Sequence, residues 1–499
     1  MRNIFFRYSV AALFTLSFFS CSKLDETPYS SIYTENFYQT AEDAEAALAA
    51  VYNELADLYS GPSALLVPDF SADQVYPRPV VGRDTYTLFS FDPQYSAVVS
   101  YGRANESPID IWNNCYTGIE NANWVLLKVP NTKMSNEVRK KAILGEAYFL
   151  RAFFHWFLTK NFGDVVIRVK ASQSMNDAYV GKSAKADVYK QIFQDLDSAE
   201  ANLPEYSGSL IKGRPCKEAA AALYAKAALY NENWAVSLRE AQKVLNSATG
   251  IGLMDNVTDV YDATREDAAR KENLWAFEAE SVTNGRSSQI MSLYGPPGSA
   301  APAYGATSYG SAFAYQAFFD SFDPKDKRRL LMDTNYVNKQ GATVHQAAIT
   351  PVTTHGVLVK KYADRNSVGG LHSTNIPIFR VADVCLIAAE AEARLNGATG
   401  NAYQYINRVR TRAGLDGLTE GLGKDAFIVA VLQERSWELF AEGDRWYDLT
   451  RTNTFMQVIP GAVNDVFRVR NPQARHQYFP IPQTEVNANN LLEQNPAWK

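Results

Sequence analysis

The amino-acid sequence predicts a mainly α-helical protein in which paired helices carry long irregular loops. Three observations support this fold class. Most of the chain after residue 40 has apolar residues at three- and four-residue spacing, which places them on one face of a helix. Two pairs of such segments are separated only by a short turn. Two stretches rich in proline, glycine, serine and tyrosine interrupt the helical pattern and predict loops.

The composition is that of an ordinary globular chain. Of its 499 residues 46% are hydrophobic and 21% charged, which excludes intrinsic disorder and collagen-like structure. The 49 Lys and Arg residues against 54 Asp and Glu residues give a net charge of −5, so no general basic excess indicates a nucleic-acid partner. Four widely spaced cysteines exclude a disulfide-rich scaffold and a CxxC metal site.

The first twenty residues predict a targeting segment. Arg2 and Arg7 precede an apolar run over 8–19 that is too short to span a bilayer comfortably. The run ends at Ser20 and Cys21, and this ending resembles a bacterial lipobox, in which Cys21 would become the lipidated N-terminus. An ordinary secretory signal over 1–20 is the alternative. The acidic residues that follow Cys21 resemble the surface-export signal of lipoproteins in the Bacteroidetes group.

Helices are expected where the apolar spacing persists. The strongest lies at 136–160, and its stretch 142–158 is apolar on almost every face, which is typical of a helix buried between neighbours. Glu146, Arg151 and His155 interrupt this stretch and argue against a membrane span, and we expect His155 to be a core residue with satisfied hydrogen bonds. Further helices are expected at 41–59 with Thr40 as the N-cap, 109–128, 184–202 and 425–441.

Two helix pairs are joined by short turns, 217–230 with 234–247 and 382–395 with 402–412. Helix hairpins of this length resemble tetratricopeptide repeats, which stack into a superhelix. Small alanine side chains on the first helix of the first pair allow its partner to approach closely. The cysteines in these apolar, helical contexts are expected to be buried packing thiols: Cys115, Cys216 and Cys385.

Two long stretches lack the helical pattern, 66–105 and 281–313. Loops of this length are uncommon in a compact protein and are usually functional or disordered, and their many tyrosines argue against disorder. The stretch 333–374 also lacks helical periodicity, and a short strand is expected within it at 357–361.

Several motifs, in order along the chain, resemble those of the SusD/RagB family. Residues 141–167 read KAILGEAYFLRAFFHWFLTKNFGDVVI, residues 403–415 read YQYINRVRTRAGL and residues 433–451 read QERSWELFAEGDRWYDLTR. The helix around 376–395, with Arg380, Ala382-Asp383-Val384 and Ala389-Glu390-Ala391, and the C-terminal end from Ile481-Pro482 onward also fit. The resemblance covers the chain after the signal segment. It implies one domain over 21–499, with an N-terminal part to about 235 and a C-terminal part from about 236.

The resemblance implies a function class. Proteins of this family are lipid-anchored at the cell surface, on the outer membrane of Bacteroidetes. They are not enzymes, and they capture a nutrient, most often a glycan, for a SusC-like TonB-dependent transporter on which they sit as a lid. Their fold consists of tetratricopeptide-like helix hairpins with long ligand loops. RagB-type relatives handle peptides, so capture of a peptide is the alternative function, and a lid that binds nothing tightly is a further one.

In this family the ligand loops come from the two long stretches, and we expect the glycan site there. A sugar ring offers apolar C–H faces edged by hydroxyl groups, so a binder needs flat aromatic rings and a few polar side chains. Any single tyrosine could instead pack within the protein. Neither loop contains Trp, on which starch-binding members stack sugars, so starch as the ligand is in doubt. The expected ligand-binding residues are Asp73, Arg83, Tyr86, Tyr294, Tyr304 and Tyr309.

The C-terminal carboxylates suggest a rival function. Glu438 and Glu442 with Asp444 or Asp448 could form the carboxylate pair of a glycoside hydrolase. Arginines lie between them, so we favour ion pairs that fix the last helix to its neighbours, and we interpret Arg380, Asp383, Glu146 and Arg151 in the same way. No metal-ligand spacing, nucleophile elbow or phosphate loop is present, so no cofactor is expected; a structural calcium ion is left open.

Overall fold

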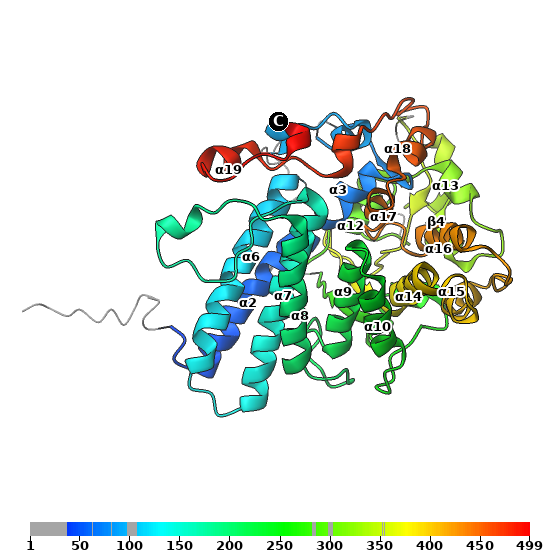
Figure 1. Cartoon of the computed structure of the whole chain (residues 1–499). Helices are drawn as coiled ribbons and strands as arrows, with labels where there is room; N and C mark the ends of the chain where they lie inside the picture. Colours follow the sequence, from blue (N-terminus) through cyan, green and yellow to red (C-terminus); the bar gives the residue numbers. More distant parts are fainter. Residues whose placement is uncertain are drawn as a thin grey trace, which may run out of the picture.

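Stacked helix pairs form the body of the protein (Figure 1). The computed structural model describes residues 37–499 except 62, 81, 97–106, 282–285, 298–302, 352 and 354. Neighbouring helices in this stack pack against one another in chain order, and α10 also packs against α14. The long helices are α2 (Ala41–Ser60), α6 (Pro108–Lys128), α7 (Glu137–Phe162), α8 (Lys185–Asn202), α9 (Lys217–Tyr230), α10 (Trp234–Leu245), α14 (Val381–Asn396), α15 (Gly400–Arg412) and α16 (Lys424–Glu438). The predicted helical fold class is confirmed.

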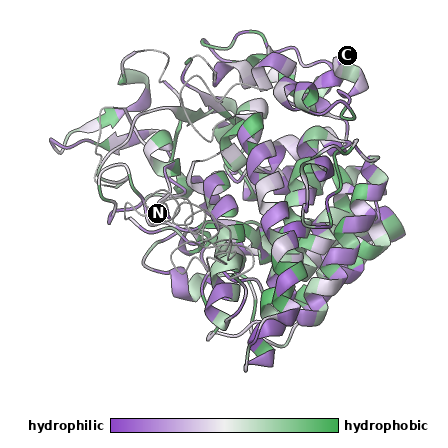
Figure 2. Cartoon of the chain, turned by 90° about the vertical axis from the view of Figure 1, so that its left-hand side faces the viewer, coloured by the Kyte–Doolittle hydropathy of each residue, from purple (hydrophilic) through white to green (hydrophobic). Residues whose placement is uncertain are grey.

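The starts of the long helices follow their local sequence. At α2 the Thr40 side chain accepts from the Asp43 N–H while the Asp43 carboxylate accepts from the Thr40 N–H, so the predicted N-cap is part of a capping box. At α7 the Asn136 side chain accepts from the Arg139 N–H. In the side view of Figure 2 the helices carry both hydrophilic and hydrophobic stretches, as expected of helices that pack along one side.

Helix α7 forms the centre of the core. Its residue Phe153 has ring contacts with Trp156 and Phe157 on the same helix and with Trp275 and Phe379 from a distant part of the chain. His155 is fully buried; its Nδ1 donates to the Arg151 carbonyl at 3.0 Å and its Nε2 accepts from the Arg168 N–H at 3.2 Å. Burial and the nearby Arg151 charge lower the His155 pKa to about 3. The prediction of a satisfied core histidine is confirmed.

At Gly118, α6 packs directly against the Phe154 ring of α7. A Cβ atom built on Gly118 would lie closer to the Phe154 ring than van der Waals contact permits. We expect Gly118→Ala to lower the free energy of unfolding, because overpacking costs about 1–3 kcal/mol. The higher helix propensity of alanine offsets up to about 1 kcal/mol of this cost. Urea unfolding followed by tryptophan fluorescence measures the change. Gly461→Ala is the control because a Cβ at Gly461 meets no atom within 4 Å, and equal stability of Gly118→Ala and the wild type would contradict the close contact.

The remaining elements are short and connect the stack. The short helices are α3 (Ser63–Ser71), α4 (Asp84–Leu88), α5 (Pro93–Ser96), α11 (Glu266–Ala269), α12 (Ile290–Tyr294), α13 (Gln316–Asp320), α17 (Arg445–Arg451), α18 (Phe455–Val458) and α19 (Gln483–Ala488). The strands form two-stranded antiparallel sheets: β1 (Val75–Pro77) with β3 (Ala312–Ala314), β2 (Asn273–Phe277) with β8 (Ile376–Arg380), β4 (Met332–Asp333) with β7 (Leu358–Val359), and β5 (Asn335–Val337) with β6 (Thr343–His345). The strand expected at 357–361 is therefore β7.

Several sequence predictions of element bounds are wrong, since α12 also lies within the stretch 281–313, where no helix is expected. The stretch 66–105 was expected to be a loop from its start, but α3 extends to Ser71 and buries every residue it contains, despite Pro68 inside it. The helix expected to reach residue 441 ends at Glu438. The carbonyl oxygens after this end are bonded by side chains from elsewhere, since Lys361 donates to Phe440 at 2.7 Å and Tyr362 to Ala441 at 2.9 Å.

The C-terminal region holds the end of α3 and the residues that follow it. The Gln74 side chain donates to the Ser436 carbonyl at 2.7 Å, and the Gly443 N–H donates to the Asp69 carboxylate at 3.1 Å. The buried guanidinium of Arg470 donates to the carbonyls of Ser71 and Ala72 at 3.0 and 2.9 Å. Residues more than 350 positions apart in the chain therefore satisfy one another's buried polar groups.

The structure tests the predictions for three cysteines but not the prediction for Cys21. Cys115, Cys216 and Cys385 are buried and free, as expected of packing thiols. Cys21 lies outside the described residues. Within the described part of the chain, no helix combines the length and the apolar character needed to cross a membrane.

Candidate functional site

The two long loop stretches meet in a small sheet. Strand β1 pairs with β3 so that Tyr76 lies opposite Phe313, and the Arg78 N–H extends the pairing by donating to the Ser311 carbonyl at 2.9 Å. The rings of Tyr76 and Tyr315 pack against each other with centroids 4.8 Å apart. Described residues of the two stretches therefore lie side by side.

A third segment joins them. Val357 forms a bridge with Ala314, and His372 forms one with Ser288. The Ser367 hydroxyl accepts from the Ala306 N–H at 2.6 Å. We call the surface built by segments 75–96, 286–297, 303–315 and 357–375 the loop face. Its members are far apart in sequence, and backbone hydrogen bonds fix their relative positions.

Tyr309 is the aromatic residue that the loop face presents to solvent. Its side chain is 49% exposed. The backbone on both sides is anchored to α12 and the residues after it, because the Tyr309 N–H donates to the Ser292 carbonyl at 2.6 Å and the Gly310 N–H to the Gly295 carbonyl at 3.0 Å. Gly310 has φ of +56°, and a Cβ there would lie 2.7 Å from Pro297, so only glycine fits this turn without strain. Tyr309 is therefore exposed on a turn that backbone hydrogen bonds hold in place.

Beside Tyr309 lies a turn of the third segment. Val368 and Leu371 close this turn through reciprocal backbone hydrogen bonds of 3.0 Å. A Cβ built on Gly370 would lie 3.1 Å from the Tyr309 hydroxyl, so the turn passes directly by the ring. Arg365 and Asn366 precede the turn with exposed side chains. The turn that passes the exposed ring is thus preceded by a guanidinium and an amide, which are groups that a sugar hydroxyl can bond.

The other tyrosines expected at the site are buried. Tyr86 packs edge-on against Tyr95 and Phe479. The Tyr294 hydroxyl donates to Asp69 at 3.1 Å, and the Tyr304 hydroxyl to Asp333 at 2.7 Å. All three have at most 1% of their surface exposed and offer no open ring face to a ligand in this structure. The alternative that a loop tyrosine packs within the protein therefore holds for Tyr86, Tyr294 and Tyr304, because a buried phenol gains from apolar burial and from a carboxylate partner.

Of the expected polar ligand residues, Asp73 is half-buried and Arg83 is buried. Asp73 forms a bidentate ion pair with Arg445 at 2.8 and 2.9 Å. Burial opposes ionisation of Asp73, but the Arg445 charge holds the pKa of the carboxyl below its usual value. Arg83 is 6% exposed. Of the expected ligand-binding residues the structure thus presents Tyr309 to solvent, and its contact with a ligand stays a prediction.

The sequence analysis did not predict that residues 365–370 contribute to the surface around Tyr309. The lack of helical periodicity in 333–374 was visible, but nothing in the residue pattern indicated that this stretch reaches Tyr309. The pairing of Gly369 and Gly370 was the available signal, because adjacent glycines predict a tight turn that another side chain can approach.

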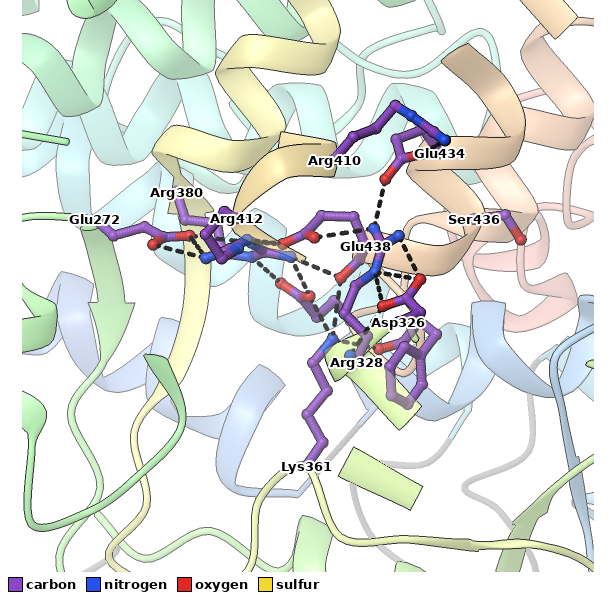
Figure 3. Close-up of polar contacts among 12 residues, drawn as sticks. Glu272, Asp326, Arg328, Lys361, Arg380, Arg410, Arg412, Glu434, Ser436 and Glu438 are labelled. Atoms are coloured by element: carbon purple, nitrogen blue, oxygen red, sulfur yellow. Dashed lines mark hydrogen bonds and ion pairs between the residues drawn. The ribbon is translucent and has the colours of Figure 1, made fainter. Parts of the chain in front are cut away.

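The C-terminal carboxylates lie in a buried ion-pair network (Figure 3). Glu438 is 1% exposed and pairs with Arg380 at 2.6 Å, Arg412 at 2.5 Å and Arg328 at 3.2 Å. Glu442 pairs with Lys361 at 2.6 Å and with Arg380 at 2.8 Å. The network joins α16 to β8, α15 and the residues before β4.

A second part of the network continues toward α17 and α9. Arg435 bridges Asp383 at 2.7 Å and Asp448 at 2.8 Å, and Lys226 bridges Asp383 at 2.9 Å and Asp444 at 2.6 Å. Elsewhere in the core, Glu146 pairs with Arg139 and Arg214, and Arg151 with Asp195. The interpretation of these charges as structural ion pairs is confirmed.

The electrostatics around Glu438 and Glu442 favour their ionised forms. Burial by itself would raise the pKa of Glu438, but the charges of Arg412, Arg380 and Arg328 hold it well below its usual value. Burial also opposes ionisation of Glu442, but the charges of Arg380 and Lys361 hold the pKa of its carboxyl below the usual value. A hydrolase needs one carboxylic acid with a raised pKa beside the scissile bond in an accessible cleft. The Glu438 and Glu442 carboxylates are buried against cations, so the observation on which the hydrolase hypothesis depended is not found.

Within the described residues, no three His, Cys, Asp or Glu side chains are grouped in a way that could hold a metal ion.

Comparison with known proteins gives two family matches along the chain. Residues 304–498 match a family described as "SusD family", and residues 23–229 match one described as "Starch-binding associating with outer membrane". The first match contains Tyr309 and the 365–370 turn, and the second contains β1 and α3.

Individual relatives match over most of their length. The chain is 28% identical to SusD-like protein P25 of Formosa agariphila, covering 96% of each chain, and 25% identical to starch-binding protein SusD of Bacteroides thetaiotaomicron, covering 71% of this chain and 72% of that one. Among solved structures, a laminarin-binding SusD-like protein superposes with a TM-score of 0.76 at 22% identity, covering 92% of this chain and 100% of that one. This likeness shows that the fold is shared.

Proposed function

Because this chain belongs to the SusD family, we propose that it binds a glycan on the loop face and delivers it to a SusC-like TonB-dependent transporter. The observation that carries the proposal is the exposed Tyr309 ring on its hydrogen-bonded turn, next to the 368–371 turn that the exposed residues Arg365 and Asn366 precede. Two relatives support the ligand class, since one is named for binding starch and another for binding laminarin.

The binding chemistry follows from this geometry. One face of a sugar ring stacks on Tyr309, and the edge hydroxyls bond to the guanidinium of Arg365 and the amide of Asn366. Because the backbone is already fixed by the bonds from the Tyr309 N–H to Ser292 and from the Gly310 N–H to Gly295, little conformational entropy is lost on binding. A single stacking ring tolerates related sugars, so the proposal includes modest selectivity. Binding of this kind needs no cofactor and no chemical step.

The proposal places the protein at the cell surface, on the outer membrane. The lipid on Cys21 would hold it there, which agrees with the family description of association with the outer membrane. Labelling of the expressed protein with a radioactive or clickable fatty acid tests this part, and retention of the label in Cys21→Ser would contradict it.

The binding test uses soluble protein that begins at residue 22. We expect Tyr309→Ala to weaken binding of a recognised glycan about tenfold, because loss of stacking costs about 1–2 kcal/mol. A glycan and peptide array selects the ligand, and calorimetry measures the affinity.

Tyr405→Ala is the matched control, because Tyr405 is a part-exposed tyrosine on α15, outside the loop face. Unchanged affinity in Tyr309→Ala would remove the loop face from the binding site. Binding to peptides alone would support the RagB-type alternative.

A further inference from the structure

A separate pocket of about 610 Å³ shares no lining residue with the loop face. It is bounded by α6, by the segment 163–184 and by α19 near the C-terminus. In Figure 1 this segment projects beside α6, below α19. The volume falls in the range of about 300–1,000 Å³ that is typical of small-molecule sites.

The walls of this pocket are fixed by hydrogen bonds. The Glu120 carboxylate accepts from the Ser172 N–H at 2.7 Å, and the Arg168 guanidinium donates to the carbonyls of Asp177 and Ala178 at 2.9 and 2.6 Å. The Tyr116 hydroxyl accepts from the Val166 N–H at 2.9 Å and donates to its carbonyl at 3.1 Å. The projecting segment is thus held to α6 at several points and keeps the pocket open.

The pocket combines apolar rings with polar side chains that have no partner. Tyr179 on the projecting segment is 46% exposed, and the ring of Trp112 packs on Tyr116 at a centroid distance of 4.8 Å. In the described part of the chain, no hydrogen bond or ion pair engages the side chains of Asn113, Thr117 and Glu485, which line the same pocket. Bonding groups therefore face a space between aromatic walls.

We propose that this pocket is a second saccharide-binding site that takes one or two neutral sugar residues. The Glu485 carboxylate can accept from adjacent hydroxyls, and the amide of Asn113 and the hydroxyl of Thr117 can both donate and accept. Glu120 and Glu485 disfavour an anionic ligand, because the Arg168 charge is already directed at backbone carbonyls. The inference shares only the ligand class with the proposed function, so either site can fail without the other.

The first test is crystallographic. Crystals of the protein from residue 22 onward are soaked separately with laminarihexaose, maltohexaose and cellohexaose. We expect a sugar ring beside Tyr179 with hydroxyl groups on Glu485 for at least one of them. A pocket empty of sugar with all three overturns the proposal.

The second test measures the pocket in solution and keeps the two sites apart. In the Tyr309→Ala background, we expect Tyr179→Ala and Glu485→Gln each to weaken binding of the soaked oligosaccharide about tenfold. Met175→Ala is the control, since Met175 lies on the same segment, is 85% exposed and does not line the pocket.

Each other outcome has a defined meaning. An equal loss in Met175→Ala would show that a wider surface of the segment, such as a protein-docking surface, carries the effect, and would overturn the proposal. Binding in crystals without binding in solution would overturn it as well. Pocket binding that persists when Tyr309→Ala has no effect would support this inference and contradict the proposed role of the loop face.

Discussion

Glu438→Ala is expected to lower the free energy of unfolding by about 3–5 kcal/mol, the cost typical of breaking a buried ion pair by removing one partner. Glu438 is 1% exposed and faces Arg328, Arg380 and Arg412, so its loss leaves several buried cations with less compensation. Glycan affinity of the molecules that remain folded should not change, because these side chains are not on the loop face. Urea unfolding followed by tryptophan fluorescence gives the free energy.

Glu420→Ala provides the matched control for Glu438→Ala. Glu420 is an exposed glutamate shortly before α16 and takes part in none of the ion pairs of the described residues. We expect its replacement to change the free energy by no more than about 0.5 kcal/mol. A similarly small change in Glu438→Ala would contradict the assignment of the network as a stabilising element. A loss of glycan binding without a loss of stability would instead support a functional role of the carboxylates.

Acid is expected to destabilise the protein steeply below about pH 4. Glu438, Glu442, Asp383 and Asp448 have pKa values below their usual ones in the folded protein, because surrounding Arg and Lys charges outweigh the effect of burial. A carboxyl group with a lowered folded-state pKa stabilises the protein above its unfolded-state pKa, and that stabilisation is lost as the pH falls through the folded value. One such group is worth about 2–3 kcal/mol, so the loss between pH 5 and pH 3 should exceed about 3 kcal/mol.

Between pH 7 and about pH 4.5, opposing groups should reduce the net change. Burial raises the pKa of Asp69 and of Glu266 to about 7, so protonation of these groups stabilises the folded protein as the pH falls from 7. His155, with its pKa lowered to about 3, acts in the opposite sense, because the unfolded chain takes up a proton below pH 6.5. Unfolding free energies at pH 7, 5 and 3.5 test the profile, and equal stability at pH 5 and 3.5 would contradict it.

The helices could be predicted from the sequence because the residues that determine each helix lie within or next to it. Apolar spacing, the N-cap at Thr40 and the short turns between paired segments all lie within a few residues of the element that they define, and α9 spans the residues expected of it. The end of α16 could not be predicted, because Lys361 and Tyr362, which bond the carbonyls after it, come from a distant segment.

The candidate site was predictable only in outline. Composition located the two loop stretches and their tyrosines, but composition does not tell which rings are exposed. Burial of Tyr294 and Tyr304 depends on acidic partners at Asp69 and Asp333 that are distant in sequence, and the exposure of Tyr309 depends on a turn fixed by α12. Such pairings are set by tertiary structure, and the periodicity of a single sequence does not predict which distant residues meet.

The bonds between the segment after α3 and the C-terminal region have a consequence for the order in which the protein can be made and folded. The ribosome releases the N-terminal residues first, yet the buried carbonyls of Ser71 and Ala72 find their donor only when Arg470 has been synthesised. An incomplete chain therefore cannot reach the native arrangement around α3, and folding of this part must wait for nearly the whole length. Contacts of such large sequence separation also slow folding. We expect chains truncated before residue 436 to stay open to proteolysis at residues 63–96, even where their helix pairs have formed.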